Sequence, residues 1–425
     1  MEGGCPMKDA FIIGAYGTSF KKWPDKSFKD LTRDAYMGVL HDAGLSSGED
    51  IDGAWFGNSG MARWGQACIR GQVCFIPLVR EKLFPERAPI INVEAACATG
   101  SLAFHGAWKD VLSGLADLSL AVGVEKIYNP DLEYLEMFKT FQQGIDNFDP
   151  EEWIEVYRRT AESLGKAFNP DVAGHTIFME TYAIQAAHHM KKYGTTQRQM
   201  ALCAAKNHHF GSLNPKAQYQ FEIPVEQVLA DRTVSWPLTR AMCAPISDGA
   251  AAVLVCSGDF LKGQPPSVQE RAVKVKASVL TSGKYRDADE PTLSGVAAQR
   301  AYALAGVGPG DVQLAEVHDA ASFCEILQTE MMGFCKEGGG GPLVESGRTG
   351  LDGDLPINTS GGLVSMGHPV AATGLSMIYE LVLQLRREAG PRQVRNNPRI
   401  ALQQNGGGLM GLEEAACSVV ILEKD

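Results

Sequence analysis

The first half of the chain contains a series of elements that recurs, in the same order, in the second half. Residues 31–57 have the pattern of a helix closed by Ala-Gly, an acidic loop and a strand, and residues 297–319 repeat that pattern. Self-similarity of this kind indicates two related supersecondary units. Because such units bury their apolar faces in layers, the repeat predicts a pseudo-twofold pair of mixed α/β halves, with helices on both faces of each sheet.

The repeat continues into the segments with the most distinctive chemistry. In the first half, Cys97-Ala-Thr-Gly-Ser-Leu opens a predicted helix. In the second half, Ala371-Ala-Thr-Gly-Leu-Ser opens the matching helix, directly after Gly367-His368-Pro369. Matching positions in a pseudo-twofold pair bring the two helix N-termini towards a shared centre. Cys97 and His368 are therefore predicted neighbours, although they are far apart in the sequence.

Cys97 lies where a predicted strand over residues 89–93 gives way to a helix. The unpaired backbone N–H groups and the positive dipole end of a helix N-terminus stabilise a thiolate and an oxyanion formed beside it. This position suits a nucleophile. The alternative is that Cys97 is one more small buried hydrophobic residue, which is the usual role of a cysteine considered by itself.

The composition changes between the two halves. Residues 129–235 are acidic, aromatic and interrupted by Asn and Pro, with helices predicted over 133–139, 151–157 and 176–193. We interpret this segment as an inserted cap domain. The predicted N-terminal half is then 1–128 with 236–264, where residues 244–255 return the chain to the last strand of that half, and the C-terminal half is 268–425.

Overall composition limits the class of protein. With 45% hydrophobic and 21% charged residues, the 425-residue chain has the make-up of a globular protein of two or three domains. Its formal charge of −11 argues against a general nucleic-acid partner. The chain shows no secretory signal and no apolar span long enough to cross a bilayer, so we expect a cytoplasmic protein without a membrane partner.

The ten cysteines show no Cys-x-x-Cys pair and no evident zinc spacing. Reduced thiols fit this pattern better than a disulfide framework. We therefore expect no metal in this chain.

Five short signatures occur in an order that resembles the thiolase superfamily. They are Cys97 in Ala-Cys-Ala-Thr-Gly, Ser247-Asp248-Gly249, His318 in Glu-Val-His-Asp, Gly367-His368-Pro369 and Gly406-Gly407-Gly408. His318-Asp319 is similar to the motif of the sterol-carrier-protein-type and archaeal-type branch. The resemblance implies the thiolase fold, with two pseudo-twofold halves in a layered α-β-α-β-α arrangement and an inserted cap. It also implies the activity of an acyl-CoA C-acyltransferase.

By this resemblance, Cys97 would take the acyl group as a thioester, and His368 would accept the thiol proton. His318 would complete a first oxyanion hole. The backbone N–H groups of Cys97 and of the chain near Gly406 would form a second hole, for the enolate of a CoA thioester. The alternative for both histidines is an ordinary core or surface role.

The resemblance also implies substrates and partners. Coenzyme A and an acyl-CoA would be the substrates, and a homodimer the core of the assembly. Thiolases of this branch often work with a small zinc-ribbon and OB-fold subunit. For the CoA phosphates, the cap offers Lys191, Lys192, Arg198 and Lys206, although like charges on a helix usually form a solvated face.

Two departures from the family pattern affect the acid/base group. Gln404 stands where many thiolases have a cysteine before the C-terminal glycine loop, and Ala320 follows His318-Asp319 where the branch tends to have another. Neither residue transfers protons. Cys324 and Asp319 remain as candidates for the group that protonates the departing enolate.

The substrate is predicted from the cap. Its size and aromatic content are similar to those of the thiolases that cleave benzoylsuccinyl-CoA in anaerobic toluene degradation, so a bulky or aromatic acyl group is expected. Two alternatives remain open. One is aldolase-type cleavage or acyl transfer to a non-CoA acceptor on the same fold, and the other is a non-catalytic thiolase-like subunit.

Overall fold

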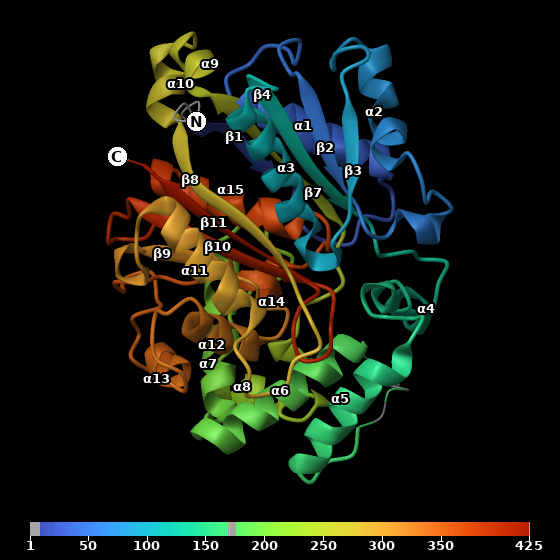
Figure 1. The fold of residues 1–425 in the computed structure, drawn as a ribbon, viewed down its shortest axis with the longest axis vertical. Helices are drawn as coiled ribbons and strands as arrows, with labels where there is room; N and C mark the ends of the chain where they lie inside the picture. The colour runs from blue at the N-terminus through green and yellow to red at the C-terminus, as the bar shows by residue number, and fades with distance from the viewer. Residues whose placement is uncertain (1–8, 169, 171–175, 425) are drawn as a thin grey trace, which may run out of the picture.

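The computed structural model describes residues 9–168, 170 and 176–424 (Figure 1). Within these residues, nine strands join into one mixed sheet in the order β3-β2-β4-β7-β1-β8-β11-β10-β9. The strands of the first half of this sheet are β1 (Ala10–Gly17), β2 (Gly53–Gly57), β3 (Ile90–Val93), β4 (Leu118–Glu125) and β7 (Gly249–Ser257). Those of the second half are β8 (Val273–Ser282), β9 (Leu314–Val317), β10 (Ile400–Gly407) and β11 (Ala416–Glu423).

The two halves of the sheet have the same pairing pattern. In the first, β7 is antiparallel to β1 and β4, and β4 is parallel to β2. In the second, β11 is antiparallel to β8 and β10, and β10 is parallel to β9. The halves meet where β1 and β8 pair antiparallel, at Phe11 with Lys274 and Ile12 with Val273. An antiparallel junction of equivalent strands is what a pseudo-twofold axis requires, so the predicted symmetry is confirmed.

The helices form three layers around these strands. α1 (Phe28–Asp42) and α2 (Arg70–Arg80) pack on the first half with a core of their own, and α11 (Leu293–Ala305) does the same on the second. α3 (Thr99–Ser113) and α15 (Thr373–Arg386) share a third core with strands of both halves. Because α3 and α15 lie between the two halves, the arrangement is the predicted α-β-α-β-α one.

Local sequence explains several of these elements. Ser27 and Asp30 form a capping box at the start of α1, in which the Ser27 hydroxyl accepts the N–H of Asp30 at 3.2 Å. β4 and β7 are buried along their whole length, which accounts for their unbroken apolar sequences.

Glycines allow α3 and α15 to approach each other closely at their N-termini. A methyl group on Gly100 would lie 2.7 Å from the carbonyl oxygen of Ala371, and one on Gly123, in the neighbouring strand β4, would overlap the same oxygen. A methyl group on Gly374 would lie 2.7 Å from the backbone nitrogen of Ser101. Side chains at these positions would force the two helix N-termini apart.

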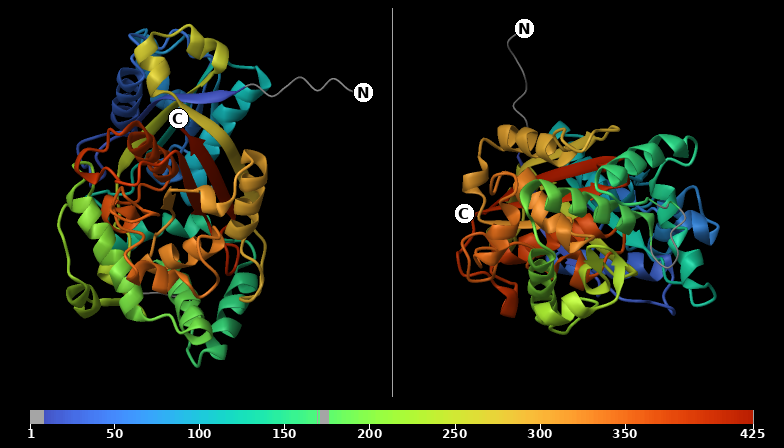
Figure 2. Two further views of the ribbon diagram at one scale, coloured as in Figure 1. Left: turned by 90° about the vertical axis from the view of Figure 1, so that its left-hand side faces the viewer. Right: turned by 90° about the horizontal axis from the view of Figure 1, so that it is seen from below.

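The cap consists of helices at one end of the molecule, opposite α9 and α10 (Figure 2). Its elements are α4 (Tyr134–Phe138), α5 (Pro150–Ser163), α6 (Ile177–Tyr193), α7 (Gln197–Ser212), α8 (Val225–Ala230) and β5 (Thr233–Ser235). β5 pairs with β6 (Leu238–Thr239), just beyond the predicted boundary of the cap. The predicted cap helices correspond to α4, α5 and α6. Cap side chains such as Tyr182 and Met200 share one core with Phe323 and Leu363 of the second half. The cap therefore packs as a continuation of the C-terminal half.

The remaining helices are short or connect these layers. They are α9 (Gly258–Lys262), α10 (Pro266–Arg271), α12 (Ser322–Met331), α13 (Gly340–Glu345), α14 (Gly362–Met366) and the 3₁₀ helices η1 (Met61–Trp64), η2 (Ala96–Ala98), η3 (Phe141–Gly144), η4 (Arg240–Met242), η5 (Pro309–Asp311) and η6 (Gly390–Arg392). In the described part of the chain, no helix combines the length and apolar character needed to span a membrane.

Gly100→Ala tests the close approach of α3 and α15. The added methyl group would lie 2.7 Å from the carbonyl oxygen of Ala371, and overpacking of this kind costs about 3 kcal/mol of unfolding free energy when the backbone cannot shift. Urea unfolding measures the loss. Gly310→Ala is the matched control, because a methyl group there meets no atom of the described residues within 4 Å. Equal stability of the two variants would show that the helices can separate without cost.

Candidate active site

Three buried side chains from separate elements meet where the two halves join. Cys97 lies on η2, His368 lies between α14 and α15, and His318 directly follows β9. One side-chain atom from each lies within 4.8 Å of the others. The Cys97 Sγ is 3.1 Å from the His368 Nε2, and the two imidazole rings stand edge to face with centroids 5.3 Å apart. The structure thus places Cys97 beside His368, as the repeat predicts, and adds His318 to the pair.

The hydrogen bonds of His368 indicate which ring nitrogen carries its proton. Its Nδ1 is 2.7 Å from the Thr373 hydroxyl, which donates to the carbonyl of Pro369 at 3.1 Å. Because a hydroxyl has one proton, Thr373 then accepts the N–H of His368 Nδ1. The Nε2 is left as an acceptor for the Cys97 thiol. The backbone N–H of His368 donates to Ser247 Oγ at 3.0 Å, which gives the Ser247-Asp248 signature a role in holding this turn.

His318 has the opposite arrangement. Its Nδ1 lies 3.0 Å from Asn405 Nδ2, and Asn405 Oδ1 accepts the Ser101 hydroxyl at 2.8 Å. Ser101 in turn accepts the side-chain N–H of Gln403 at 2.8 Å. This chain orients the Asn405 amide so that it donates to His318 Nδ1, which leaves the proton on His318 Nε2. His318 is therefore a hydrogen-bond donor towards the other two residues.

Sequence reasoning missed Asn405 and Ser101. Asn405 directly precedes the Gly406-Gly407-Gly408 run, and Ser101 follows Cys97 by about one helical turn. Asn405 and Ser101 could have been identified from the sequence as neighbours of the signatures. The hydrogen bond between them could not, because it joins α3 to β10, which are far apart in the sequence.

Burial determines the charge state of the site. It raises the pKa of the Cys97 thiol to about 12, with Glu94 adding to the effect, while the N–H groups of Gly408 and Cys97 itself act in the opposite direction. Burial lowers the pKa of His318 to about 4 and holds that of His368 well below its usual range. The resting pair is a neutral thiol and a neutral imidazole. The helix N-terminus alone suggested a thiolate, but desolvation outweighs it.

The glycine run brings the backbone of β10 against the nucleophile. A methyl group on Gly407 would lie 2.8 Å from the Cys97 nitrogen, and Gly408 has a φ of +69°. Among the backbone N–H groups that lower the pKa of the Cys97 thiol, that of Gly408 has the largest effect. Gly406, predicted to lie at the second oxyanion hole, packs against the carboxyl group of Glu414.

Cys97 and His368 line a cavity of about 640 Å³. Aromatic side chains of the cap make up much of its wall, namely Phe138, Phe141, Phe178, Tyr182 and Tyr219. Lys22, Arg232 and Arg240 add positive charge, and Arg240 is paired with Asp231 at 3.0 Å. The basic residues predicted from the cap helices lie elsewhere: Lys192 pairs with Asp289, Arg198 with Glu226 and Lys206 with Glu325, while Lys191 donates to the carbonyl of Ser163.

The two predicted acid/base candidates lie outside this cavity wall. Asp319 accepts the N–H of Leu363 at 2.6 Å and the amide of Asn207 at 2.8 Å, so its carboxyl group ties α14 and α7 together. Cys324 lies on α12 in the core shared with the cap. Burial raises the pKa of both groups well above their usual ranges.

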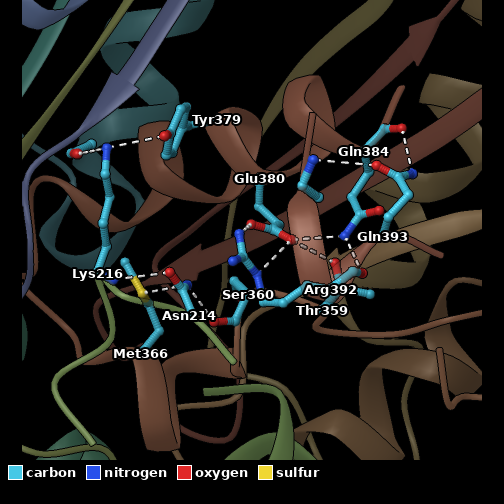
Figure 3. Close-up of polar contacts among 12 residues, drawn as sticks. Asn214, Lys216, Thr359, Ser360, Met366, Tyr379, Glu380, Gln384, Arg392 and Gln393 are labelled. Atoms are coloured by element: carbon cyan, nitrogen blue, oxygen red, sulfur yellow. Dashed lines mark hydrogen bonds and ion pairs between the residues drawn. The ribbon is translucent and has the colours of Figure 1, made fainter. Parts of the chain in front are cut away.

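A buried polar network fixes the segment that carries His368 (Figure 3). Lys216 donates to the carbonyl of Gly17 at 2.6 Å and to the Tyr379 hydroxyl at 3.0 Å. Asn214 bonds to the carbonyl of Ser360 and to Met366, just before the His368 turn. On the far side of α15, the carboxylate of Glu380 pairs with Arg392 at 2.7 Å. Both α14 and α15 are therefore anchored, and the imidazole between them has little freedom.

A thiol beside a neutral imidazole and backbone N–H donors is an arrangement suited to enzymes that use a cysteine nucleophile. Family models agree: residues 10–235 match "Thiolase, N-terminal domain" and residues 279–424 match "Thiolase C-terminal domain-like". The chain therefore belongs to the thiolase family, and it is an acyltransferase.

Several named proteins are similar to this chain along most of its length. It is 36% identical to the acetyl-CoA acetyltransferase of Methanothermobacter thermautotrophicus, over 95% of this chain and 98% of that protein. It is 32% identical to sterol carrier protein 2 of Homo sapiens, over 97% and 74%. It is 29% identical to the benzoylsuccinyl-CoA thiolase subunit BbsB of Thauera aromatica, over 94% and 95%.

Solved structures with lower identity share the fold. The Ltp2-ChsH2(DUF35) aldolase superposes with a TM-score of 0.78 at 20% identity, covering 99% of this chain and 98% of that one. The Acat5 thiolase from Ascaris suum, solved with coenzyme A, gives a TM-score of 0.66 at 16% identity, over 98% and 100%.

The neutral state of Cys97 predicts how it reacts with iodoacetamide. Because the thiolate is the reacting form and the pKa of Cys97 is raised to about 12, the rate should rise about tenfold per pH unit from pH 7 to pH 10. Peptide mass spectrometry follows Cys97, with the exposed Cys68 as an internal comparison. A rate that is already constant at neutral pH would instead indicate a thiolate–imidazolium pair.

Asn405→Asp tests the tautomer of His318. A carboxylate accepts where the amide donates, so it would draw the proton to His318 Nδ1 and remove the donor at Nε2. Loss of one oxyanion donor typically costs about 100-fold in turnover. We expect a loss of that size in kcat/KM for acetoacetyl-CoA thiolysis. Asn147→Asp, the same change at an exposed cap position, should leave the rate unaltered; an Asn405→Asp enzyme with full activity would show that His318 is not a donor.

Proposed function

We propose that this chain catalyses the CoA-dependent cleavage of a 3-oxoacyl-CoA, or the reverse Claisen condensation, through an acyl thioester on Cys97. The observation that carries the proposal is the 3.1 Å contact between Cys97 Sγ and His368 Nε2 at the wall of an aromatic cavity. We further propose that the acyl group is bulky or aromatic.

The first step uses the neutral pair as it stands. His368 Nε2 takes the Cys97 proton as the sulfur attacks the ketone carbon of the substrate. The oxygen of that carbon becomes negative, and the proton on His318 Nε2 is directed at it. A donor in such a position contributes about 3 kcal/mol to transition-state stabilisation. Buried imidazoles are suited to this step because a developing negative charge offsets the cost of protonating one of them.

The carbon–carbon bond then breaks and its electron pair forms the enolate of the departing CoA thioester. The backbone N–H groups of Cys97 and Gly408, which already lower the pKa of the buried thiol, support an anion at this position. Gly406 is retained as the predicted member of this second hole. In the last step, the thiol of coenzyme A attacks the Cys97 thioester and releases the shortened acyl-CoA.

The cavity supports a large acyl group. A volume of about 640 Å³ lies within the range of roughly 300 to 1,000 Å³ typical of sites for drug-sized ligands. Phe138, Phe141 and Phe178 give it aromatic faces that stack on a ring. The relative named as a benzoylsuccinyl-CoA thiolase subunit supports the same choice. We propose benzoylsuccinyl-CoA as the type of substrate, and Lys22, Arg232 and Arg240 as partners for the CoA phosphates.

We propose a homodimer and a small zinc-ribbon and OB-fold partner. β3 is the outermost strand of the first half among the described residues, so its free edge can pair with the same strand of a second copy. A relative described as a subunit, and a similar fold solved as an Ltp2-ChsH2(DUF35) aldolase, support the second partner.

Aldolase-type cleavage is the alternative. The observation that favours it is Gln404 and Ala320 at the two places where thiolases have an acid/base cysteine. Aldolase-type cleavage would proceed without free coenzyme A, whereas thiolysis requires free coenzyme A as the acyl acceptor.

Intact-protein mass spectrometry tests the proposal. The enzyme is incubated briefly with acetoacetyl-CoA and with benzoylsuccinyl-CoA, in the absence of coenzyme A. We expect an acetyl or benzoyl-type adduct on Cys97 and none on Cys97→Ser, whose thiolysis rate should fall at least about a thousandfold. Cleavage without any adduct, or undiminished cleavage by Cys97→Ser, would replace thiolysis with the aldolase reading.

A further inference from the structure

A second, very small cavity lies next to the substrate cavity, and Tyr182 lines both. Its volume is about 10 Å³, close to the minimum of about 10 to 15 Å³ that one water molecule needs. Its wall combines leucine side chains with polar groups, namely Gln185 and Tyr182 from α6, Gln328 from α12, Ser294 from α11 and Glu414 from the loop before β11. Tyr182 is 6% exposed, and because it lines both cavities it lies between this chamber and the space around Cys97.

The small cavity adjoins a third, larger one on the outside. That outer cavity has a volume of about 740 Å³ and shares Gln185, Arg286 and Leu412 with the small one. Asp289 and Glu290 on its wall have side chains that are 70% and 41% exposed. The three cavities thus form a series from solvent to Cys97, with Tyr182 at the inner boundary.

Two observations concern the protonation of Glu414 in this chamber. The Gln328 Nε2 donates to Glu414 Oε1 at 3.3 Å, while Gln328 Oε1 is buried without a hydrogen-bond partner among the described residues. An unpaired buried amide oxygen needs a donor, and a protonated Glu414 or a water in the chamber would supply one. Burial, together with Glu413, raises the pKa of Glu414.

The groups that face Glu414 come from every element around it. Gln328 and Cys324 lie on α12, Tyr182 on α6, Tyr157 on α5, Cys417 on β11, and Arg286 and Glu413 on the adjoining loops. Arg286 is the one positive charge in this set, and Glu413 pairs with it at 3.3 Å. Glu414 is therefore left in largely neutral surroundings, where a protonated carboxyl group is stable.

We propose that Tyr182 donates the proton to the departing enolate, and that Glu414 resupplies Tyr182 across the small cavity. The proposal rests on the thiolase function argued above and deepens it. It names the acid/base pair that Gln404 and Ala320 cannot provide. Tyr182 is the proton-transfer residue at the substrate, and Glu414 is a positioning residue that acts through it.

The protons balance over one turnover. Cys97 gives its proton to His368 as the carbon–sulfur bond forms. The carbon–carbon bond breaks, the enolate carbon takes the Tyr182 proton, and the phenolate takes one from the Glu414 carboxyl group. When the thiol of coenzyme A attacks the thioester, its proton returns to Tyr182 and Glu414, and His368 returns its own to Cys97. The proton that ends on the carbon product is therefore replaced by the thiol proton of coenzyme A.

The test separates carbon acid chemistry from acyl transfer. In deuterium oxide the same relay runs in reverse: an ionised Glu414 takes the Tyr182 proton, the phenolate takes a methyl proton of acetyl-CoA, and a deuteron returns to the enolate carbon. Proton NMR follows this methyl exchange. Acetyl transfer between Cys97 and isotopically labelled coenzyme A needs only Cys97 and His368. General acid–base groups contribute about 10² to 10⁴ in rate. For Tyr182→Phe we expect methyl exchange to fall about 100-fold or more, with acetyl transfer within about threefold of the unmodified enzyme.

Glu414→Gln is the second variant, because it keeps the shape of the chamber if Tyr182→Phe disturbs the cap. We expect it to slow methyl exchange about tenfold and to spare acetyl transfer. Tyr36→Phe is the control for loss of a buried phenol, since the Tyr36 hydroxyl bonds to the carbonyl of Leu83 far from the site. It should change neither rate.

Three results would overturn the proposal: unchanged methyl exchange in Tyr182→Phe, unchanged exchange in Glu414→Gln, or parallel losses of exchange and acetyl transfer, which would mean that the residues only shape the cavity. Failure of the proposed thiolase function would give a result distinct from these three. In that case the unmodified enzyme would form no acetyl adduct on Cys97.

Discussion

The close approach of α3 and α15 is the constraint on which the rest of the structure depends. Gly100 and Gly374 let the backbone of one helix N-terminus lie against the other, and Gly123 lets β4 lie against the segment that leads into α15. The same contact brings together the turns that carry Cys97 and His368. Because both turns are anchored in the shared core, neither side chain relies on a mobile loop for its position. The packing that holds the two halves together therefore also positions Cys97 beside His368.

Burial gives this pair an unusual resting state. Desolvation keeps both partners uncharged, so the reactivity of the cysteine does not come from a standing thiolate. Activation instead depends on hydrogen bonds that are already in place: Thr373 directs the free Nε2 of His368 at the thiol, and Asn405 directs a proton of His318 into the site. The site is prepared for a charge that only the bound substrate brings, which protects the thiol from unrelated electrophiles.

The sequence predicted the parts of this site that follow from backbone symmetry. The repeat correctly predicted matched halves, and it placed Cys97 beside His368. It could not predict contacts that depend on side-chain direction. Cys324 follows His318 closely in the sequence, yet α12 directs it into the core. Lys192 and Lys206 are cap cations, yet both face acidic partners away from the cavity. Asn405 and Tyr182 were missed because their partners come from segments distant in the sequence.

The shared core of the cap and the C-terminal half affects how this enzyme can change over evolutionary time. Because α6 packs on α12 in that core, the cap is not a lid hinged over the site. Its inner surface is fixed in position, so one exchanged side chain on α4, or on α6 at a position other than Tyr182, would reshape the proposed acyl-binding space. The reactive cysteine and histidines sit on other elements and would be undisturbed. New substrates are thus accessible by small steps, without any intermediate in which the chemistry is lost.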